Sequence, residues 1–542
     1  MACSKIFSGD LPELTYEIIK YFKDDFSTLH SCILVNRLWC RLAIPLLWEN
    51  PFSIPTGNYN FIEIYLYNLN GDLKTKLNEY KINDDLSSTN TLFNYPSFIK
   101  YLNTWRIITS IEKWSEDIVR TLKPEYRYSL GDLGMVSNFR RLIQMSLFKI
   151  FIENEVNLHT LDVEVFTFFN YNSYYDDIIE LFLQNPNFIH NVKNLKLYIG
   201  GSSGFTYHND NDEYTLINNR ILQMINLHQN LKKVLLSYNN FPLYQPLLLS
   251  KDYNCSNTLN TIIFYRVNFK GINYLNKIFE QLNVLESVHI VYCSSLDASL
   301  IQQIINLTKP FKLKSLFISG RSHVDESLLL LLQKSGHYLE NFGCGYGIGY
   351  GLSLKQLLES IIKYCKNIKL FDSCKFENQI VHLVFNLIEN IKQNLNYLSI
   401  NVFNDIQISN NNIECSSILL QSLGQALPSK LEYLNLSLHI KTSDFEIFLE
   451  NSHNTFIKKL LINNIEGQDI LPYVKEYIMK KKRVKYLAIM DSVESTLVNG
   501  NYSSKELHSS KDEVKEFRLY DIKVQTYYSL LINMYGFIKE CD

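Results

Sequence analysis

The chain has 542 residues, of which 46% are hydrophobic and 13% aromatic, so it is long enough to build a large core or an extended array of small units. Its 53 Lys and Arg residues nearly balance its 55 Asp and Glu residues, and a net charge of -2 argues against a broad nucleic-acid-binding surface. The ten cysteines are scattered singly, which is typical of reduced, buried thiols rather than of a disulfide scaffold or a zinc site.

The N-terminal stretch 11–52 predicts three short helices. Apolar residues recur at helical spacing over 12–23. Ser27-Thr28 offers a hydroxyl cap for a second helix, and Asn36 offers a cap for a third, which Pro45 is expected to interrupt. Three helices in about 40 residues carry more apolar surface than they can bury among themselves. We therefore predict that this unit docks onto a partner.

Several motifs in this stretch are similar in order and spacing to an F-box, the module that links a substrate receptor to the adaptor subunit of a cullin–RING ubiquitin ligase. They are Leu11-Pro12, Ile18-Ile19, the run 34–39 (LVNRLW) and Leu46-Leu47-Trp48. The alternative is an unrelated three-helix cap, because short motifs also occur by chance.

The resemblance implies that six residues meet the C-terminal helices of the adaptor: Leu11, Pro12, Ile18, Leu34, Val35 and Trp39. Leu14, Phe22 and Leu42 are then the residues expected to hold the three helices together. On this basis we assign residues 8–52 to an F-box-like adaptor-binding domain. Residues 53–150 contain amphipathic stretches around a polar run at 83–94, and we interpret them as a helical spacer.

From residue 157 onwards the chain repeats an L-x-x-L-x-L pattern, mostly at intervals of about 26 to 30 residues. The pattern resembles a leucine-rich repeat, which implies an α/β solenoid over 151–542 with parallel strands on the concave face and helices on the convex face. Helices are predicted between the strands, for example over 296–308, 325–335 and 353–365. The thirteen repeats start at Leu158, Val192, Leu231, Leu259, Leu285, Leu313, Leu339, Ile368, Leu395, Leu431, Ile457, Val484 and Val514.

In each predicted strand, the residue between the two alternating apolar positions should point to the concave face. These residues are Asp162, Lys196, Leu235, Ile263, His289, Phe317, Gly343, Asp372, Ser399, Asn435, Leu461, Ala488 and Arg518. Large apolar side chains among them form a candidate interaction patch. We predict that a protein substrate binds there to Leu235, Ile263, Tyr265, His289 and Phe317. The alternative is that a loop, the C-terminal tail or another copy of the chain covers the patch.

Motifs for catalysis and metal binding lack their required context. The run 200–204 (GGSSG) matches a hydrolase nucleophile elbow, but a polar run follows Ser202 where a helix should begin. The alternating glycines of 343–351 fit neither G-x-G-x-x-G nor a P-loop, and 210–221 lacks the glycine and the final Glu of a calcium loop. We therefore expect no enzyme activity, no cofactor and no metal.

The location of the protein follows from what the sequence lacks. Residues 1–10 have no apolar core of a signal peptide, and no run of about 18 apolar residues can span a membrane. We expect a cytoplasmic or nuclear protein without membrane contact. The basic run 480–483 (KKKR) is either a nuclear localisation signal or the cationic last turn of a helix over 470–482.

The repeats predict a concave binding surface, and the resemblance to an F-box implies in addition that the chain is a substrate-recognition subunit of an SCF-type cullin–RING ubiquitin ligase. Its F-box-like unit binds the adaptor, and its repeats bind a protein substrate. One alternative is a leucine-rich-repeat scaffold protein without ligase association. Another is a hydrolase built on Ser202.

Overall fold

The computed structural model is mixed α/β, with mostly parallel strands that follow one another in chain order and alternate with helices. Among the helices in the described ranges, none combines the length and the apolar character that a membrane crossing needs. The structure describes residues 11–23, 25–54, 58–67, 69, 71–79, 91–121, 133–166, 172–190, 192–200, 212–227, 230–238, 241–249, 255–318, 326–344, 352–374, 380–402, 410–493 and 503–541.

The chain divides into two compact units. The N-terminal unit comprises Met1–Val234 and Leu243–Leu259, and the C-terminal unit comprises Leu235–Pro242 and Asn260–Asp542. The N-terminal unit therefore contains the F-box-like stretch, the spacer and the first repeats together. The division of the chain at residues 52 and 150 into an F-box-like domain, a spacer and a repeat domain remains a prediction.

The N-terminal unit begins with three helices: α2 (Pro12–Lys20), α3 (Phe26–Ile33) and α4 (Arg37–Leu47). The predicted cap of α4 is confirmed, because the side chain of Asn36 accepts a hydrogen bond of 3.0 Å from the backbone N–H of Trp39. The cap of α3 is Asp25 rather than Ser27-Thr28, and its carboxylate accepts from the backbone N–H of Thr28 at 3.1 Å. A carboxylate at the positive end of a helix is also favoured by the helix dipole.

Pro45 does not interrupt the third helix. Helix α4 continues through it to Leu47. Pro45 lies in the last turn, where the missing N–H removes one hydrogen bond and only two more helical residues follow. The prediction of an interruption is therefore wrong.

The stretch predicted to be a helical spacer is mostly helical but also contains a strand. Strand β1 pairs in parallel with β2, with Tyr101 opposite Thr160. The sheet therefore starts before the first predicted repeat. This strand was not predicted from the sequence, because three residues are too few to show a period. The elements here are η1 (Pro51–Ser53), α5 (Phe61–Leu66), α6 (Gly71–Glu79), η3 (Tyr95–Phe98), β1 (Tyr101–Asn103), α7 (Thr104–Thr121) and α9 (Leu133–Glu153).

The next repeats have the predicted alternation of strands and helices. Their elements are β2 (Thr160–Phe166), α10 (Asn172–Gln184), α11 (Pro186–His190), β3 (Asn194–Gly200), α12 (Asp212–Leu227), β4 (Leu231–Ser237) and α13 (Phe241–Leu249).

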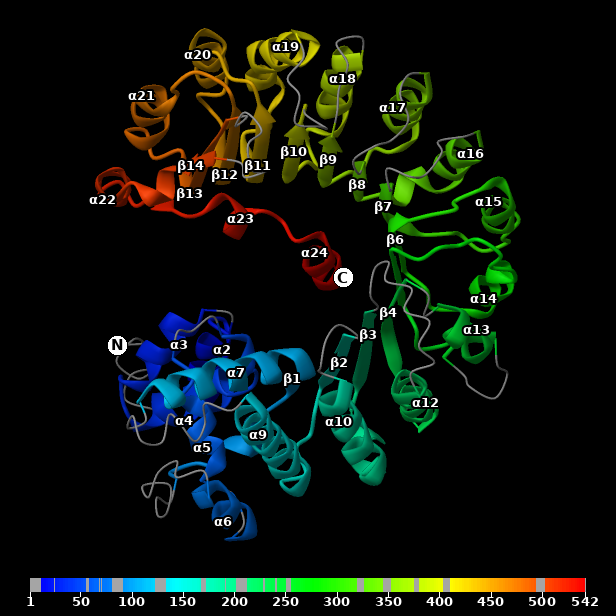
Figure 1. The fold of residues 1–542 in the computed structure, drawn as a ribbon, viewed down its shortest axis with the longest axis vertical. Helices are drawn as coiled ribbons and strands as arrows, with labels where there is room; N and C mark the ends of the chain where they lie inside the picture. The colour runs from blue at the N-terminus through cyan, green and yellow to red at the C-terminus, as the bar shows by residue number, and fades with distance from the viewer. Residues whose placement is uncertain are drawn as a thin grey trace. The chain divides into compact units, whose positions relative to one another are not determined.

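The C-terminal unit is a curved stack of strand–helix repeats, with the strands on its inner side and the helices on its outer side (Figure 1). Its strands are β5 (Thr261–Tyr265), β6 (Ser287–Cys293), β7 (Leu313–Ile318), β8 (Asn341–Cys344), β9 (Leu370–Cys374), β10 (Tyr397–Asn401), β11 (Lys430–Leu438), β12 (Phe456–Ile465) and β13 (Val484–Val493). Its main helices are α14 (Leu275–Gln281), α15 (Ala298–Ile305), α16 (Glu326–Ser335), α17 (Leu352–Tyr364), α18 (Val381–Ile391), α19 (Asn410–Ala426), α20 (Thr442–Asn451) and α21 (Leu471–Val474).

The strand register confirms most of the predicted concave row. Ser399 lies opposite Asp372 on one side and Asn435 on the other, and Leu461 lies opposite Ala488. A register shift between β6 and β7 places His289 opposite Ser315 instead of Phe317.

The thirteenth predicted repeat is not a strand. Residues after Ser510 form helix α22 (Lys511–Arg518), in which Phe517 is buried. The spacing of Val514 and Phe517 suits one face of a helix as well as a repeat, and acidic residues in the first turn favour the helix. Arg518 therefore does not belong to the concave row of strand residues.

The basic run at 480–483 also has a structural role in the stack. Arg483 is 7% exposed, and its guanidinium donates to the carbonyl oxygen of Leu449 at 3.2 Å and to Ser452 Oγ at 3.1 Å. Lys334 on α16 does the same several repeats earlier in the chain, donating to the carbonyl of Leu307 at 3.0 Å. Cations from one repeat thus satisfy carbonyls in or just after the last helical turn of the preceding repeat.

After β13 the chain turns back along the inner side of the C-terminal unit. This part consists of β14 (Ser503–Glu506), α22, β15 (Lys523–Val524), α23 (Tyr527–Leu530) and α24 (Met534–Glu540). Strand β14 is antiparallel to β13, and β15 is parallel to it. We call residues 522–541 the C-terminal segment.

Candidate functional site

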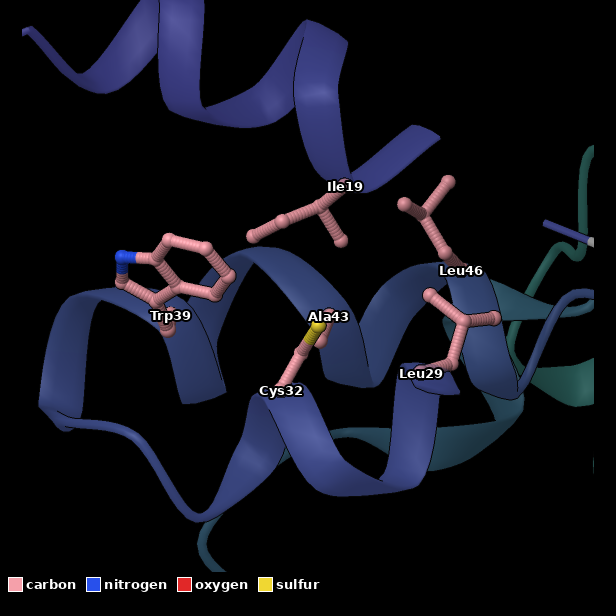
Figure 2. Packing of buried hydrophobic residues seen from close by; sticks show 6 residues of the cluster. All are labelled: Ile19, Leu29, Cys32, Trp39, Ala43 and Leu46. Carbon is pink, nitrogen blue, oxygen red and sulfur yellow. The ribbon is translucent and has the colours of Figure 1, made fainter. Parts of the chain in front are cut away.

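The three N-terminal helices share a compact core. Six buried residues converge between them, as Figure 2 shows: Ile19, Leu29, Cys32, Trp39, Ala43 and Leu46. Phe22 and Leu42 pack against this cluster, as expected from the sequence. Leu14 does not, because it is 46% exposed. The expectation that Leu14 holds the helices together is therefore wrong.

Aliphatic side chains remain exposed at two places on this three-helix unit, and Tyr21 at the end of α2 is exposed as well. Leu11 and Leu14, at the start of α2, are 42% and 46% exposed. Leu34 and Val35, in the turn between α3 and α4, are 76% and 48% exposed. Isolated exposed apolar residues are ordinary, but four of them on about 40 residues are a candidate contact surface.

The structure separates the six residues that the resemblance assigns to adaptor contact. Leu11, Leu34 and Val35 are exposed, and Pro12 and Ile18 are partly buried. Trp39 is 8% exposed and belongs to the core of the unit. Its large side chain fills the space between the helices, so its main contacts are internal.

The C-terminal boundary of the three-helix unit is fixed by aromatic side chains. The Trp48 ring lies 5.3 Å from that of Tyr65 on α5, and the Tyr65 ring lies 5.4 Å from that of Phe151 on α9. Phe52 also contacts this group at 6.1 Å from Tyr65. The three helices are therefore packed onto the spacer and are not a freely tethered module.

On the concave side of the C-terminal unit, the predicted substrate patch is not exposed. Leu235, Ile263, His289 and Phe317 have an exposed fraction of 0%, and Tyr265 is partly buried. His289 was expected at the surface, but its Nδ1 lies 2.7 Å from Ser315 Oγ in the interior. The expectation of an open apolar patch is therefore wrong: four of its five residues are buried, and Tyr265 contacts the C-terminal tail, which was one of the expected covers.

The C-terminal segment covers the concave face in two parts, and the first part, α23, packs on residues outside the predicted patch. Tyr527 and Leu530 are each 6% exposed, and the Tyr527 hydroxyl donates a hydrogen bond of 2.8 Å to Asn435 Oδ1. These two residues share a buried cluster with the concave-face residues Tyr433, Leu461, Ala488 and Met490.

The second part of the cover is α24. The ring of Tyr535 lies 5.2 Å from that of Tyr265 on β5, and the ring of Phe537 lies 5.3 Å from that of Tyr397 on β10. Farther along, Asn341 Nδ2 on β8 donates to Cys541 Sγ at 3.9 Å. Helix α24 lies on the inner side of the strands (Figure 1).

The C-terminal tail was one of the three covers expected from the sequence. A signal was available in residues 527–538 (YYSLLINMYGFI), which are apolar and aromatic yet follow the last repeat. A stretch with that composition outside the repeat pattern needs a surface to pack on.

Polar groups on the concave face are linked by hydrogen bonds. Asn435 Nδ2 donates to Ser399 Oγ at 3.2 Å, and Asn341 Nδ2 donates to Ser315 Oγ at 2.9 Å. Burial raises the pKa of Asp372 from 3.8 to about 6, although a hydrogen bond with Ser399 acts in the opposite direction. Burial likewise raises the pKa of the Cys293 thiol to about 12, which makes the thiol a weak nucleophile.

Within the described ranges, no three His, Cys, Asp or Glu side chains are grouped so that they could hold a metal ion. Ser202 and the glycines at 345–351 lie outside the described residues. The chain matches no protein-family model, and no curated protein matches it with significance.

Proposed function

We propose that this chain is the substrate-recognition subunit of an SCF-type cullin–RING ubiquitin ligase. The three N-terminal helices bind the adaptor, and the concave face of the repeats binds a protein substrate. The observation that carries the proposal is the exposure of Leu34 and Val35 beside a complete core. Both residues lie in the run whose order and spacing resemble an F-box.

The turn between α3 and α4 also offers a partner a gain in binding free energy. Leu34 and Val35 are held at the surface between two helices that already bury Trp39 and Cys32. Burying a Leu or Val side chain contributes about 1.5–3 kcal/mol relative to leaving it exposed. A partner that covers both side chains gains this free energy without reorganising the three-helix core.

A scaffold protein without ligase association is the second candidate. It is favoured by the packing of Trp48 and Phe52 against Tyr65 and Phe151, because this is how a helical cap closes the end of a solenoid. In that case the three helices protect the first repeats, and Leu34 and Val35 contact nothing outside the chain.

Co-purification of the adaptor subunit separates the two candidates. Leu34→Ala combined with Val35→Ala should lower adaptor recovery by at least about tenfold, because one lost apolar contact of 1.4 kcal/mol already has that effect. The matched control is Leu330→Ala with Ile418→Ala, which removes two exposed apolar side chains from α16 and α19. Recovery by the control should equal that of the unchanged chain.

Two results would contradict ligase association. One is failure of the unchanged chain to recover the adaptor, which favours the scaffold. The other is equal recovery by the Leu34/Val35 variant and the control, which shows that adaptor binding does not use this turn.

A further inference from the structure

The two helices of the C-terminal segment are held unequally. In α23, Tyr527 and Leu530 are buried, and the Tyr527 hydroxyl bonds to a concave-face amide. In α24, Ile538 is the sole buried residue, while Tyr535 and Phe537 remain partly exposed. The segment therefore has a firmly packed inner part and a more lightly packed outer part.

Helix α24 depends on the surface beneath it. It has seven residues, and isolated helices shorter than about 12–15 residues are marginal in water. The side chain of Asn533 caps its start by accepting from the N–H of Gly536 at 3.3 Å. One cap does not offset the cost of helix nucleation, so the concave face must supply the remaining stabilisation.

The contacts of α24 define a receptor for a helix. Residues two apart on an α-helix point about 200° apart around its axis. Tyr535 and Phe537 accordingly lie on opposite sides of α24, one against Tyr265 of β5 and the other against Tyr397 of β10. The helix thus sits between two tyrosine rings that come from strands at either end of the β5–β10 run.

We propose that the concave face between β5 and β10 is a binding site for a short helical segment of a partner protein, and that α24 is its resident, displaceable occupant. The partner segment has an aliphatic residue with an aromatic side chain on each side of it. In α24 the aliphatic residue is Ile538, and the aromatic residues are Tyr535 and Phe537. The inner helix α23 stays in place when α24 leaves. Naming the partner as a ligase substrate rests on the proposed function, whereas the site itself does not.

Tethering explains why the site is occupied in the free chain. A segment attached a few residues from its site has an effective concentration in the millimolar range, so weak contacts keep it docked. A partner helix binds only those molecules in which α24 has left the site, so its apparent affinity is its intrinsic affinity multiplied by the fraction of such molecules. Weakening α24 should therefore strengthen binding of a competing helix.

The test uses a fluorescent synthetic peptide of residues 531–541 (LINMYGFIKEC, carrying Cys541→Ser) as the probe, and the purified full-length chain without adaptor. Tyr535→Ala with Phe537→Ala in the chain should tighten peptide binding by at least about tenfold, measured by fluorescence anisotropy. The matched control is Tyr528→Ala with Leu531→Ala, which changes exposed residues of the same segment and should leave binding unchanged.

A third variant locates the site. Tyr265→Ala and Tyr397→Ala, added to the Tyr535/Phe537 variant, should abolish the gained binding. Equal peptide affinity of the unchanged chain and the Tyr535/Phe537 variant would overturn the proposal. So would peptide binding that survives the loss of both receptor tyrosines.

Hydrogen exchange on the unchanged chain gives an independent measurement that no folding defect can obscure. The amides of Phe537 and Cys541, which are hydrogen-bonded in α24, should exchange at least about tenfold faster than those of Gln525 and Leu531, which are hydrogen-bonded in the inner part of the segment, because α24 opens locally while α23 stays packed. Equal protection of the two helices would show that α24 is a fixed part of the fold. Neither measurement involves the adaptor, so adaptor binding can fail without affecting this proposal, and the reverse also holds.

Discussion

Two regions of the molecule carry apolar side chains that were candidates for contact with a partner, and in only one of these regions do the side chains stay exposed. On the three-helix unit, Leu34 and Val35 remain at the surface. On the concave face of the C-terminal unit, Ile263 and Phe317 are fully buried, and the C-terminal segment lies on that face.

The difference shows how an outward apolar position should be interpreted. The direction of a side chain follows from local periodicity, but its exposure depends on whatever else packs on that face. The open turn is available for a partner at once. The concave face already has an occupant, so a partner must either displace it or bind beside it.

The largest expected effect tests whether the two regions fold independently. Leu434 on β11 is 0% exposed and lies opposite Leu398 and Leu460. Leu434→Asp should cost about 5 kcal/mol or more, because it removes core packing and buries a charge. Limited proteolysis should then cleave residues around 395–460, while the three N-terminal helices stay intact.

Lys430→Asp, at the exposed start of the same strand, is the control and should change neither the stability nor the sites of proteolytic cleavage. Loss of adaptor binding in a soluble Leu434→Asp protein would show that the two regions form one folding unit.

The second prediction contrasts Trp39 with Leu34. Trp39→Ala should lower the free energy of unfolding by about 3–5 kcal/mol, since it leaves a cavity in the three-helix core. Leu34→Ala should change it by less than about 0.5 kcal/mol, because Leu34 is exposed. Chemical denaturation measures both, and similar losses for the two variants would contradict the division into core and contact residues.

The third prediction concerns pH and the concave face. In the folded chain the pKa of Asp372 is raised from 3.8 to about 6. At a pH between these two values, the folded state therefore still holds a proton that the unfolded state has released. Stability from this group is present below about pH 4 and is lost as the pH rises through about 6. At neutral pH the ionised carboxylate costs up to about 3 kcal/mol.

Asp372→Asn should therefore raise the unfolding free energy at pH 7 and leave it nearly unchanged at pH 4. Asp521→Asn, whose side chain is 92% exposed, serves as the control. A stability profile of Asp372→Asn that runs parallel to the unchanged chain across this range would disprove the assignment.

The smallest effect concerns the inner part of the C-terminal segment. Tyr527→Phe removes the hydroxyl that donates to Asn435 Oδ1 and should cost about 1–2 kcal/mol, because the amide oxygen loses this bond in a buried place. Tyr528→Phe, at a residue that is 69% exposed, should have no measurable effect. Thermal unfolding that does not distinguish the two variants would mean that this hydrogen bond contributes nothing to docking.

The repeat period by itself predicts much of the C-terminal unit. The predicted helices over 325–335 and 353–365 correspond to α16 and α17, and the strand register places Asp372, Ser399 and Asn435 in one row. These features follow from local alternation and capping, which a few neighbouring residues determine. The helix at 511–518 was missed because its apolar spacing fits both periods.

The sequence by itself determined the positions of most helices, most strands and the apolar residues that point outward. Only the tertiary structure decided which of those residues are covered. Trp39 and Leu34 both belong to the F-box-like run, yet one fills the core and the other reaches solvent. Asn341 and Cys541 meet across a sequence separation of 200 residues, and no local pattern encodes a contact of that range. Such contacts depend on the summed packing of all intervening repeats, because each repeat fixes the position of the next.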